Sequence, residues 1–338
     1  MNTPLISIII NNHNYGSYLG EAIESVLEQP CPAAEVIVVD DGSTDDSREV
    51  MARFGDKIIP VFQANMGQIA AVNAGLQNSR GDIFCLLDAD DVFLPEKLAS
   101  IQELFRTVLP LDRPILCSHF LRIVHKDKSH TGKTLPNHFK NIRFKSLTSG
   151  PGLQPISTPE QVAEFVRKNS VPPFLGAPTS GLFFNRSFAG KMFPLPSIPG
   201  IRCGADGLIV RGGLLCAEAY CYPVALGLYR DHGRNIWFSS TRGNTRKMRM
   251  DFTFLNPWYD AFLQQTNPGV KTDYSSSIDA MWLHINREDL PRLAAMPLKF
   301  LRRGLYQRNI LGALYSLWSL LRIGTSLLLR KNATKTPS

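Results

Sequence analysis

Acidic side chains crowd together near residue 90, and they carry the strongest chemical signal in the chain. Asp88 and Asp90 flank Ala89, and Asp91 follows directly. Carboxylates placed so close repel one another unless a positive charge lies between them or some of them keep a proton. Hard oxygen ligands suit Mg²⁺ or Mn²⁺, which complete their coordination with phosphate oxygens and water. The triplet therefore predicts a divalent-metal site facing a phosphate group, with Asp82 expected in the same cluster.

Apolar, β-branched runs precede three polar segments, which places these segments at the ends of predicted strands. Runs at residues 5–10, 36–39 and 83–87 lead into the polar segments 11–14, 40–43 and 88–91. Continuous apolar runs are typical of strands buried on both faces of a parallel sheet, where ligands bind at the carboxyl ends. Stretches with helical spacing alternate with these strands and predict an α/β domain with a mostly parallel sheet. We expect the polar segments to meet at one crevice; an acidic capping cluster without metal is the alternative.

Neither glycine-rich phosphate motif, GxGxxG or GxxxxGK, supports this crevice, so a nucleotide there would be held through the metal and side chains. The runs SIIINNHNY, VVDDGSTD, NMGQ and LLDADD resemble, in order and spacing, the successive motifs of family 2 glycosyltransferases. The resemblance begins at about residue 4 and, with the later YRDHGRN run, extends to residue 238. It implies a Rossmann-like GT-A fold and an inverting transfer from a nucleoside diphosphate sugar to a hydroxyl acceptor. The Gln-x-x-Arg-Trp motif of processive members does not occur, so we expect transfer of one sugar.

The resemblance also implies which residues hold the donor. The expected nucleotide-sugar-binding residues are Asn11, His13, Asp41, Asn65, Gly67, Gln68, Asp88 and Ala89. Asp41 would contact the base, with Asn11 and His13 beside it. Family members usually carry Pro and Tyr at these two positions, so the identity of the base stays open.

Metal binding and catalysis fall to a second group of residues. The resemblance makes Asp90 the direct ligand of Mn²⁺ or Mg²⁺, with Asp88 and His232 as further candidates. Arg230 and His232 are candidates to stabilise the leaving phosphate, with a purely structural role as the alternative. Asp206 is the expected catalytic base that takes the proton of the acceptor hydroxyl, with helix capping as its alternative.

Two regions are expected along the chain. Residues 1–238 would form the catalytic domain, with a nucleotide-sugar half at about 4–98 and an acceptor half at about 115–238. Residues 239–338 would form a helical C-terminal extension. Residues 121–168 are polar and weakly periodic, which predicts a loop with one short helix near 162–166 that serves as a lid or an acceptor wall.

Excess positive charge is confined to the end of the chain. The net charge is +8, and residues 299–338 contain eight Lys or Arg and no Asp or Glu. A neutral body argues against nucleic acid as a partner. Residues 310–329 are mostly apolar, but Arg322 would cost about 3 kcal/mol at the centre of a membrane span. We therefore expect a helix at about 299–331 on an anionic membrane surface, with packing on the protein itself or on a dimer partner as the alternative.

The predicted setting is cytoplasmic, peripheral on the inner face of the membrane. The six cysteines show no zinc spacing, and the sequence opens into a strand pattern without a signal peptide. Membrane binding would suit a glycolipid or other lipid-linked glycan acceptor, or a precursor of a cell-surface polysaccharide.

Two other functions fit part of the pattern. A phosphatase of the haloacid dehalogenase type also places Asp-x-Asp-x-Val after a strand, with Asp88 as nucleophile and Asp90 as acid. That motif normally follows the first strand, and no convincing downstream Lys and paired Asp set accompanies it here. An inactive, membrane-associated scaffold is the non-enzymatic alternative, although all the expected carboxylates are present.

Overall fold

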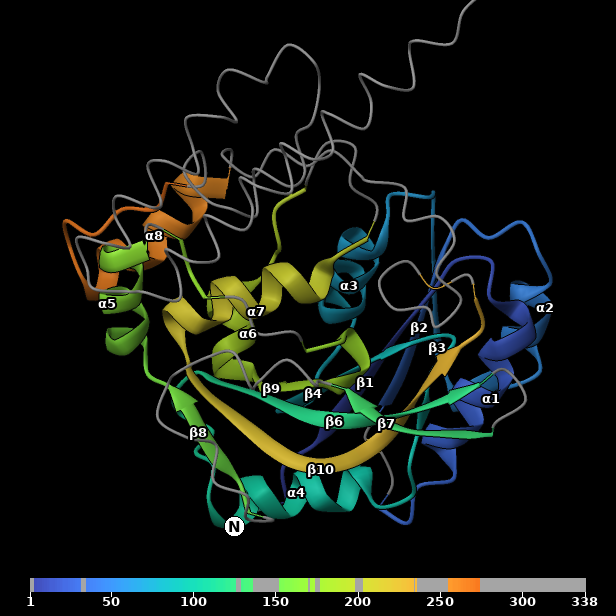
Figure 1. Cartoon of the computed structure of the whole chain (residues 1–338). Coiled ribbons are helices and arrows are strands. Elements are labelled where there is room, and N and C mark those ends of the chain that lie inside the picture. The colour runs from blue at the N-terminus through green and yellow to red at the C-terminus, as the bar shows by residue number, and fades with distance from the viewer. Residues whose placement is uncertain are drawn as a thin grey trace, which may run out of the picture. The chain divides into compact units, whose positions relative to one another are not determined.

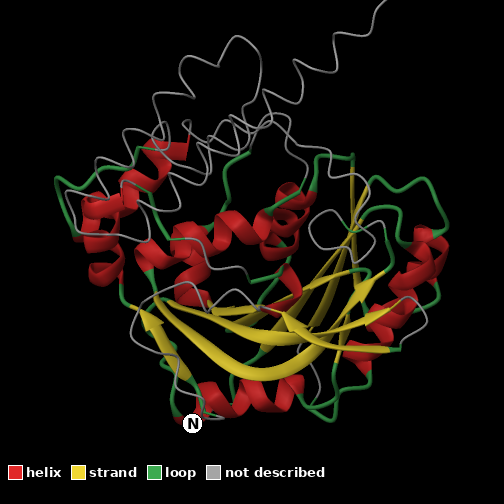
Figure 2. Cartoon of the chain, in the orientation of Figure 1, coloured by secondary structure: helices red, strands yellow, loops and turns green. Residues whose placement is uncertain are grey.

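The computed structural model describes residues 3–31, 35–125, 129–135, 152–169, 171–173, 177–197, 203–233, 235 and 255–273. Within these ranges a ten-stranded mixed sheet carries helices on both faces (Figures 1 and 2). The strands are β1 Ile6–Asn12, β2 Glu35–Asp41, β3 Ile59–Gln63, β4 Ile83–Asp88, β5 Val92–Phe93, β6 Ile115–His125, β7 His130–Leu135, β8 Gln154–Ser157, β9 Leu182–Asn185 and β10 Glu218–Asp231. Their order is β3-β2-β1-β4-β9-β6-β10-β5, while β7 pairs with β6 and β8 with β10.

Helices cover the two faces of the sheet. They are α1 Gly16–Leu27, α2 Ser47–Ala52, α3 Gln68–Gln77, α4 Lys97–Thr107, α5 Pro159–Asn169, α6 Arg186–Met192, α7 Ala205–Cys216 and α8 Asn256–Thr266. Short 3-10 turns lie at η1 Gly55–Lys57 and η3 Thr179–Gly181. Helix α4 lies on one face of the sheet, and α3, α6 and α7 lie on the other (Figure 1).

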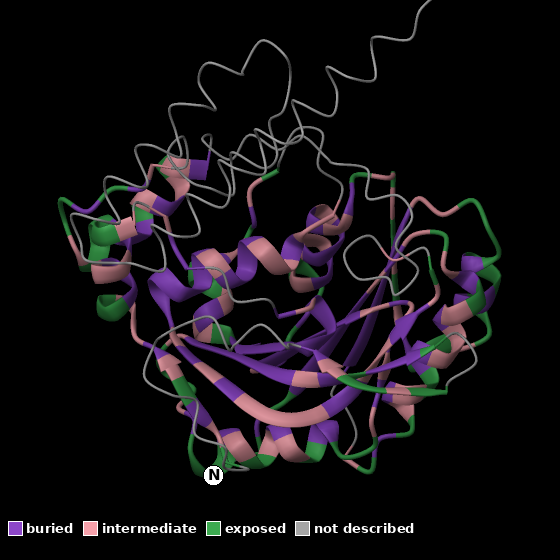
Figure 3. Ribbon diagram, viewed as in Figure 1, coloured by how far each residue is buried: buried purple, intermediate pink, exposed green. Residues whose placement is uncertain are grey.

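The first half of the sheet confirms the predicted parallel arrangement. Strands β3, β2, β1 and β4 pair in parallel. In β1, Ile8, Ile9 and Ile10 are all 0% exposed. Ile8 and Ile10 belong to the core cluster shared with α1 and α4, whereas Ile9 faces Gly75 of α3, where any larger side chain would collide. Strands buried on both faces account for the apolar runs, and the central strands in Figure 3 are mostly buried.

The second half of the sheet is mixed. Strand β9 runs antiparallel to both β4 and β6, while β6 and β10 pair in parallel. Strands β5, β7 and β8 join as antiparallel partners of longer strands. The fold is therefore α/β. Its sheet is mostly parallel only in the part where strands and helices alternate regularly along the chain.

The expectation of a loop over residues 121–168 is wrong for most of its described part. Strand β6 continues to His125, β7 and β8 add two short strands, and α5 is longer than the short helix predicted there. The buried positions Leu121, Ile123 and Leu135 form a small apolar cluster between β6 and β7. These strands form because they pair with neighbouring strands. Their outer positions are too polar for the sequence pattern to predict a strand.

The chain divides into two compact units. One comprises Met1–Asn244 with Tyr259–Lys271, and the other comprises Thr245–Trp258 with Thr272–Ser338. The second unit is described only at residues 255–258 and 272–273, and the helix expected at 299–331 lies outside the described residues. Within the described part of the chain, no helix has the length and apolar character needed to cross a membrane.

Candidate active site

Register brings the predicted polar segments to one edge of the sheet. Asn11 of β1 pairs with Asp88 of β4, and Asn12 pairs with Asp40 of β2. These residues are the last or next-to-last of their strands, so their side chains meet at the carboxyl edge, as the sequence predicted. Asp82 does not join them: it precedes β4 at the opposite edge, where its Oδ2 accepts a hydrogen bond of 2.9 Å from the Leu5 amide. The expectation that Asp82 belongs to the acidic cluster is wrong.

Asp88 lies at the centre of a hydrogen-bond network. Its Oδ1 accepts bonds from Asn11 Nδ2 at 2.9 Å and from Gln68 Nε2 at 2.8 Å. The Asp88 amide donates to Ser180 Oγ at 3.0 Å. Burial, reinforced by the neighbouring Asp90 carboxylate, raises the pKa of Asp88 to about 7, although the Asn11 bond opposes this shift. The carboxylate is thus held by neutral amides and lacks a compensating positive charge in the described structure.

Asp90 meets a residue from the far end of the sheet. His232 Nε2 lies 3.0 Å from Asp90 Oδ2, although the two residues are 142 positions apart. The side chain of His232 is 2% exposed and that of Asp90 is 15% exposed. Tyr15 and Tyr18 enclose the imidazole, with ring centroids 5.6 and 5.4 Å from it. The structure therefore brings together the predicted metal ligand Asp90 and its candidate partner His232.

Arg230 lies behind this pair. Its guanidinium donates to Glu21 Oε2 at 2.9 Å and to the Asp90 carbonyl at 3.0 Å, and it stacks 5.0 Å from the centre of the Tyr18 ring. The Arg230 amide donates to Asp91 Oδ1 at 3.1 Å. With 5% of its side chain exposed, Arg230 holds the acidic turn in place, which favours the structural alternative over a phosphate contact.

Asp41 organises the loop expected to hold the base. Its Oδ1 accepts bonds from Gln63 Nε2 at 2.7 Å and the Met66 amide at 2.8 Å, and its Oδ2 accepts from the Gly67 amide at 2.7 Å. His13 Nδ1 lies 2.8 Å from the Asp41 carbonyl. Asp41 is 3% exposed, so it shapes the loop at residues 63–67 through bonds that already occupy both carboxylate oxygens.

Asn65 and Ala89, two further residues of the expected donor site, differ in exposure. Asn65 Nδ2 lies 2.9 Å from His13 Nε2, so these two side chains form one polar surface. Ala89 is 2% exposed and its methyl group belongs to the core beneath the acidic turn. A ligand would meet Ala89 only through its backbone.

Asp206 lies in the first turn of α7. Its Oδ1 accepts a 2.8 Å bond from the Gly207 amide. Burial raises the pKa of Asp206 to about 6, against the lowering effects of the Gly207 amide and of Arg211. A carboxyl group with this pKa is ionised at neutral pH and still accepts a proton readily, which suits a general base.

Comparison with known proteins decides the family. A sequence profile of glycosyl transferase family 2 matches residues 7–142. An uncharacterized glycosyltransferase of Nostoc sp. is 33% identical over 280 residues, covering 81% of this chain and 80% of the relative. The chain belongs to glycosyl transferase family 2. A glycosyltransferase of Haemophilus influenzae is 42% identical over 102 residues, covering 29% of this chain and 41% of the relative.

Among solved structures, the glycosyltransferase fold of this chain is similar to that of S. aureus TarS 1-349 in complex with UDP-GlcNAc. The TM-score is 0.56 at 15% identity, and the match covers 95% of this chain and 92% of the other. At this identity the likeness shows the fold alone. It confirms the predicted GT-A architecture for this family 2 glycosyltransferase.

Several residues that shape this glycosyltransferase site were not singled out from the sequence. Ser180 accepts from the Asp88 amide, and Thr179 Oγ1 lies 3.2 Å from Gln68 Nε2. Lys97 is 0% exposed and donates to the Ser180 carbonyl at 2.9 Å. A polar Thr-Ser pair just before an apolar strand was the available signal. Lys97 has no such signal, because a lysine that opens a helix is usually exposed.

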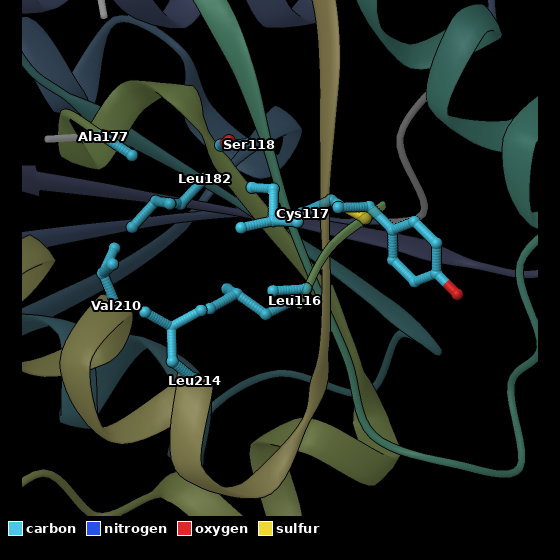
Figure 4. A pocket seen from close by; sticks show the side chains of 10 residues that line it. Leu116, Cys117, Ser118, Ala177, Leu182, Val210 and Leu214 are labelled. Carbon is cyan, nitrogen blue, oxygen red and sulfur yellow. The ribbon is translucent and has the colours of Figure 1, made fainter. Parts of the chain in front are cut away.

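An apolar cavity of about 10 Å³ lies between α7 and β6, away from the acidic turn (Figure 4). Leu116, Leu182, Val210 and Leu214 point into it. A space of this size admits at most one water molecule, so it is not the sugar site of this enzyme.

Proposed function

We propose that this enzyme transfers one sugar, with inversion, from a nucleoside diphosphate sugar to a hydroxyl acceptor. A uridine diphosphate sugar is the first donor to test, because the structurally similar TarS was crystallised with UDP-GlcNAc. The donor would occupy the carboxyl edge of β1, β2 and β4, between the His13–Asn65 surface and Asp88.

The chemistry assigns a role to each part of the edge. The acceptor oxygen forms a bond to the anomeric carbon while the bond from that carbon to the diphosphate oxygen breaks. Asp206 takes the acceptor proton, and the nucleoside diphosphate leaves with the electron pair. Attack from the face opposite the leaving group gives inversion.

The observation that carries the proposal is the contact between Asp90 and His232. A carboxylate oxygen and an imidazole nitrogen 3.0 Å apart, at the strand edge that ends in Asp88, form a partial coordination site for a divalent cation. In the described part of the chain, no three His, Cys, Asp or Glu side chains come together as a metal site. The remaining ligands of Mn²⁺ or Mg²⁺ would be diphosphate oxygens and water, as is usual for these ions.

Such a cation would supply the positive charge that the leaving diphosphate needs. Asp90 and His232 would hold it, and Asp88 would stand beside it. The surrounding tyrosines fix the imidazole ring in the orientation that presents Nε2 to Asp90.

Calorimetric titration of UDP with and without Mn²⁺ tests the donor site. We expect the metal to strengthen UDP binding at least tenfold in the wild type, and Asp90→Ala to remove that gain. Asp56→Ala serves as control, because Asp56 is an exposed carboxylate in η1. UDP affinity in Asp90→Ala that responds to Mn²⁺ as in the wild type would refute the metal role.

Sugar transfer is tested by release of UDP from UDP-GlcNAc and other UDP-sugars, with water standing in for the acceptor. Membership in the glycosyltransferase family decides against the phosphatase. The Asp-x-Asp motif of such a phosphatase would also have to follow the first strand, whereas Asp88 ends β4. A metal-bound nucleotide without any turnover, in the presence of candidate glycan acceptors, would instead support the inactive scaffold.

A further inference from the structure

Gln68 contacts three separate parts of the structure with one side chain. It is the first residue of α3, directly after the loop held by Asp41. Its Nε2 donates to Asp88 Oδ1 at 2.8 Å and to Thr179 Oγ1 at 3.2 Å. Its Oε1 accepts from the amides of Gly204 at 2.9 Å and Ala205 at 3.2 Å. The two ends of one amide therefore link the end of β4 to the beginning of α7.

The beginning of α7 has a special need for this contact. The first amides of a helix have no partners within the helix. Gly204, at the N-cap position, has no side chain and takes a left-handed conformation with φ of 98°. Gln68 satisfies two of these amides from a distant part of the chain. The capped turn includes Asp206, so the position of that carboxylate depends on Gln68.

We propose that Gln68 is a positioning residue that couples Asp88, on the donor side, to the turn of α7 that carries Asp206. This inference rests on the proposed function, because it concerns the alignment of donor and base. The amide side chain suits the task, since only a group with a donor at one end and an acceptor at the other satisfies both a carboxylate and backbone amides.

Two substitutions separate coupling from simple helix capping. Gln68→Met keeps the length of the side chain and removes both ends. Gln68→Glu keeps acceptors for the amides of Gly204 and Ala205 but opposes Asp88 with a like charge. Gln77→Met is the matched control, because Gln77 is an exposed residue at the other end of the same helix.

Activity is measured as UDP release from UDP-GlcNAc at saturating donor and Mn²⁺. We expect both Gln68 variants to lose about 100-fold in kcat, the cost of misplacing a reacting group by about 1 Å. The affinity of Gln68→Met for UDP with Mn²⁺ should stay within about threefold of wild type, and Gln77→Met should match wild type throughout. Wild-type kcat in Gln68→Glu would reduce the role to capping and overturn the coupling. A loss of UDP affinity with kcat unchanged would overturn it in favour of a direct donor contact.

Amide hydrogen exchange keeps the test independent of turnover. The amides of Gly204 and Ala205 should exchange at least tenfold faster in Gln68→Met than in the wild type or in Gln77→Met. Unchanged exchange would show that the contact does not hold α7. If wild-type protein binds no UDP, the proposed function fails, whereas the exchange result still decides whether Gln68 joins the two elements.

Discussion

Asp206 makes the pH dependence of transfer predictable. Its pKa is raised to about 6 by burial, and the Gly207 amide and Arg211 limit that rise. The pKa of Asp88 is raised to about 7, close to that of Asp206, and Asp206 contributes to this rise. The base acts in its ionised form, so the rate should increase with pH and level off above the pKa.

The size of the effect follows from the pKa. With a pKa of about 6, about one Asp206 in ten is ionised at pH 5 and about nine in ten at pH 7. The rate of the chemical step should therefore increase about tenfold between these two pH values and change little from pH 7 to 8. Because a UDP-sugar diphosphate does not titrate in this range, the donor itself contributes no slope.

Single-turnover release of UDP from UDP-GlcNAc, at saturating Mn²⁺ from pH 5 to 8, isolates the chemical step. Asp206→Asn should lower the rate by about 10²–10⁴-fold and abolish the slope. Asp56→Asn should leave both unchanged. A wild-type rate that is flat over this range would refute Asp206 as the base. The same slope surviving in Asp206→Asn would assign the titration to another group, with Asp88 the first candidate.

Three other predictions concern stability and location. Burial lowers the pKa of Lys97 from 10.5 to about 7, so between pH 7 and 9 the unfolded state binds more protons than the folded state and stability increases with pH. The free energy of unfolding in urea should therefore increase by about 2 kcal/mol in the wild type, relative to Lys97→Met, between pH 7 and 9. Gly42→Ala should lower the stability measured by thermal unfolding by roughly 1–3 kcal/mol, and by more than Gly55→Ala does. Both glycines have positive φ, but only at Gly42 would a Cβ come within 2.6 Å of the Asn65 amide nitrogen. Full-length protein should float with anionic liposomes, and a chain lacking residues 299–338 should not; full-length protein that stays in the soluble fraction contradicts the predicted membrane-surface helix.

Local sequence pattern predicted which polar side chains meet at the carboxyl edge of β1, β2 and β4, because each residue's position follows from its place on a strand. Asn11 and Asp88 come immediately after apolar runs, and parallel strands of similar length end at the same edge. The same logic failed for Asp82, which comes immediately before β4 rather than after it. Closeness in sequence to an acidic cluster says little when a whole strand of about 20 Å separates the two ends.

The second half of the sheet was harder to predict because strands far apart in the sequence pair to form it. Strand β6 pairs with β7, which follows it directly, and with β9 and β10, which come much later in the sequence. The link from Gln68 to Gly204 spans 136 positions, and no periodicity encodes it. Motif resemblance named Asp90 and His232, but only the folded chain shows that tyrosines of the α1 start hold the imidazole against the carboxylate.

Charge balance at the edge bears on the order in which ligands bind. Burial and the nearby carboxylates raise the pKa of Asp88 and, well above its usual range, that of Asp91. Arg230 is committed to Glu21 and the Asp90 carbonyl. A diphosphate arriving alone would add negative charge to an edge that already carries an excess of it, whereas a divalent cation relieves the repulsion among the carboxylates and attracts the phosphates. We therefore expect nucleotide affinity to depend on Mn²⁺ more steeply as pH rises from 6 to 8, since ionisation of Asp88 in that range increases the repulsion that the cation must offset. Nucleotide affinity measured at several pH values with and without the cation checks this; a metal-dependent gain that shrinks with pH would contradict it.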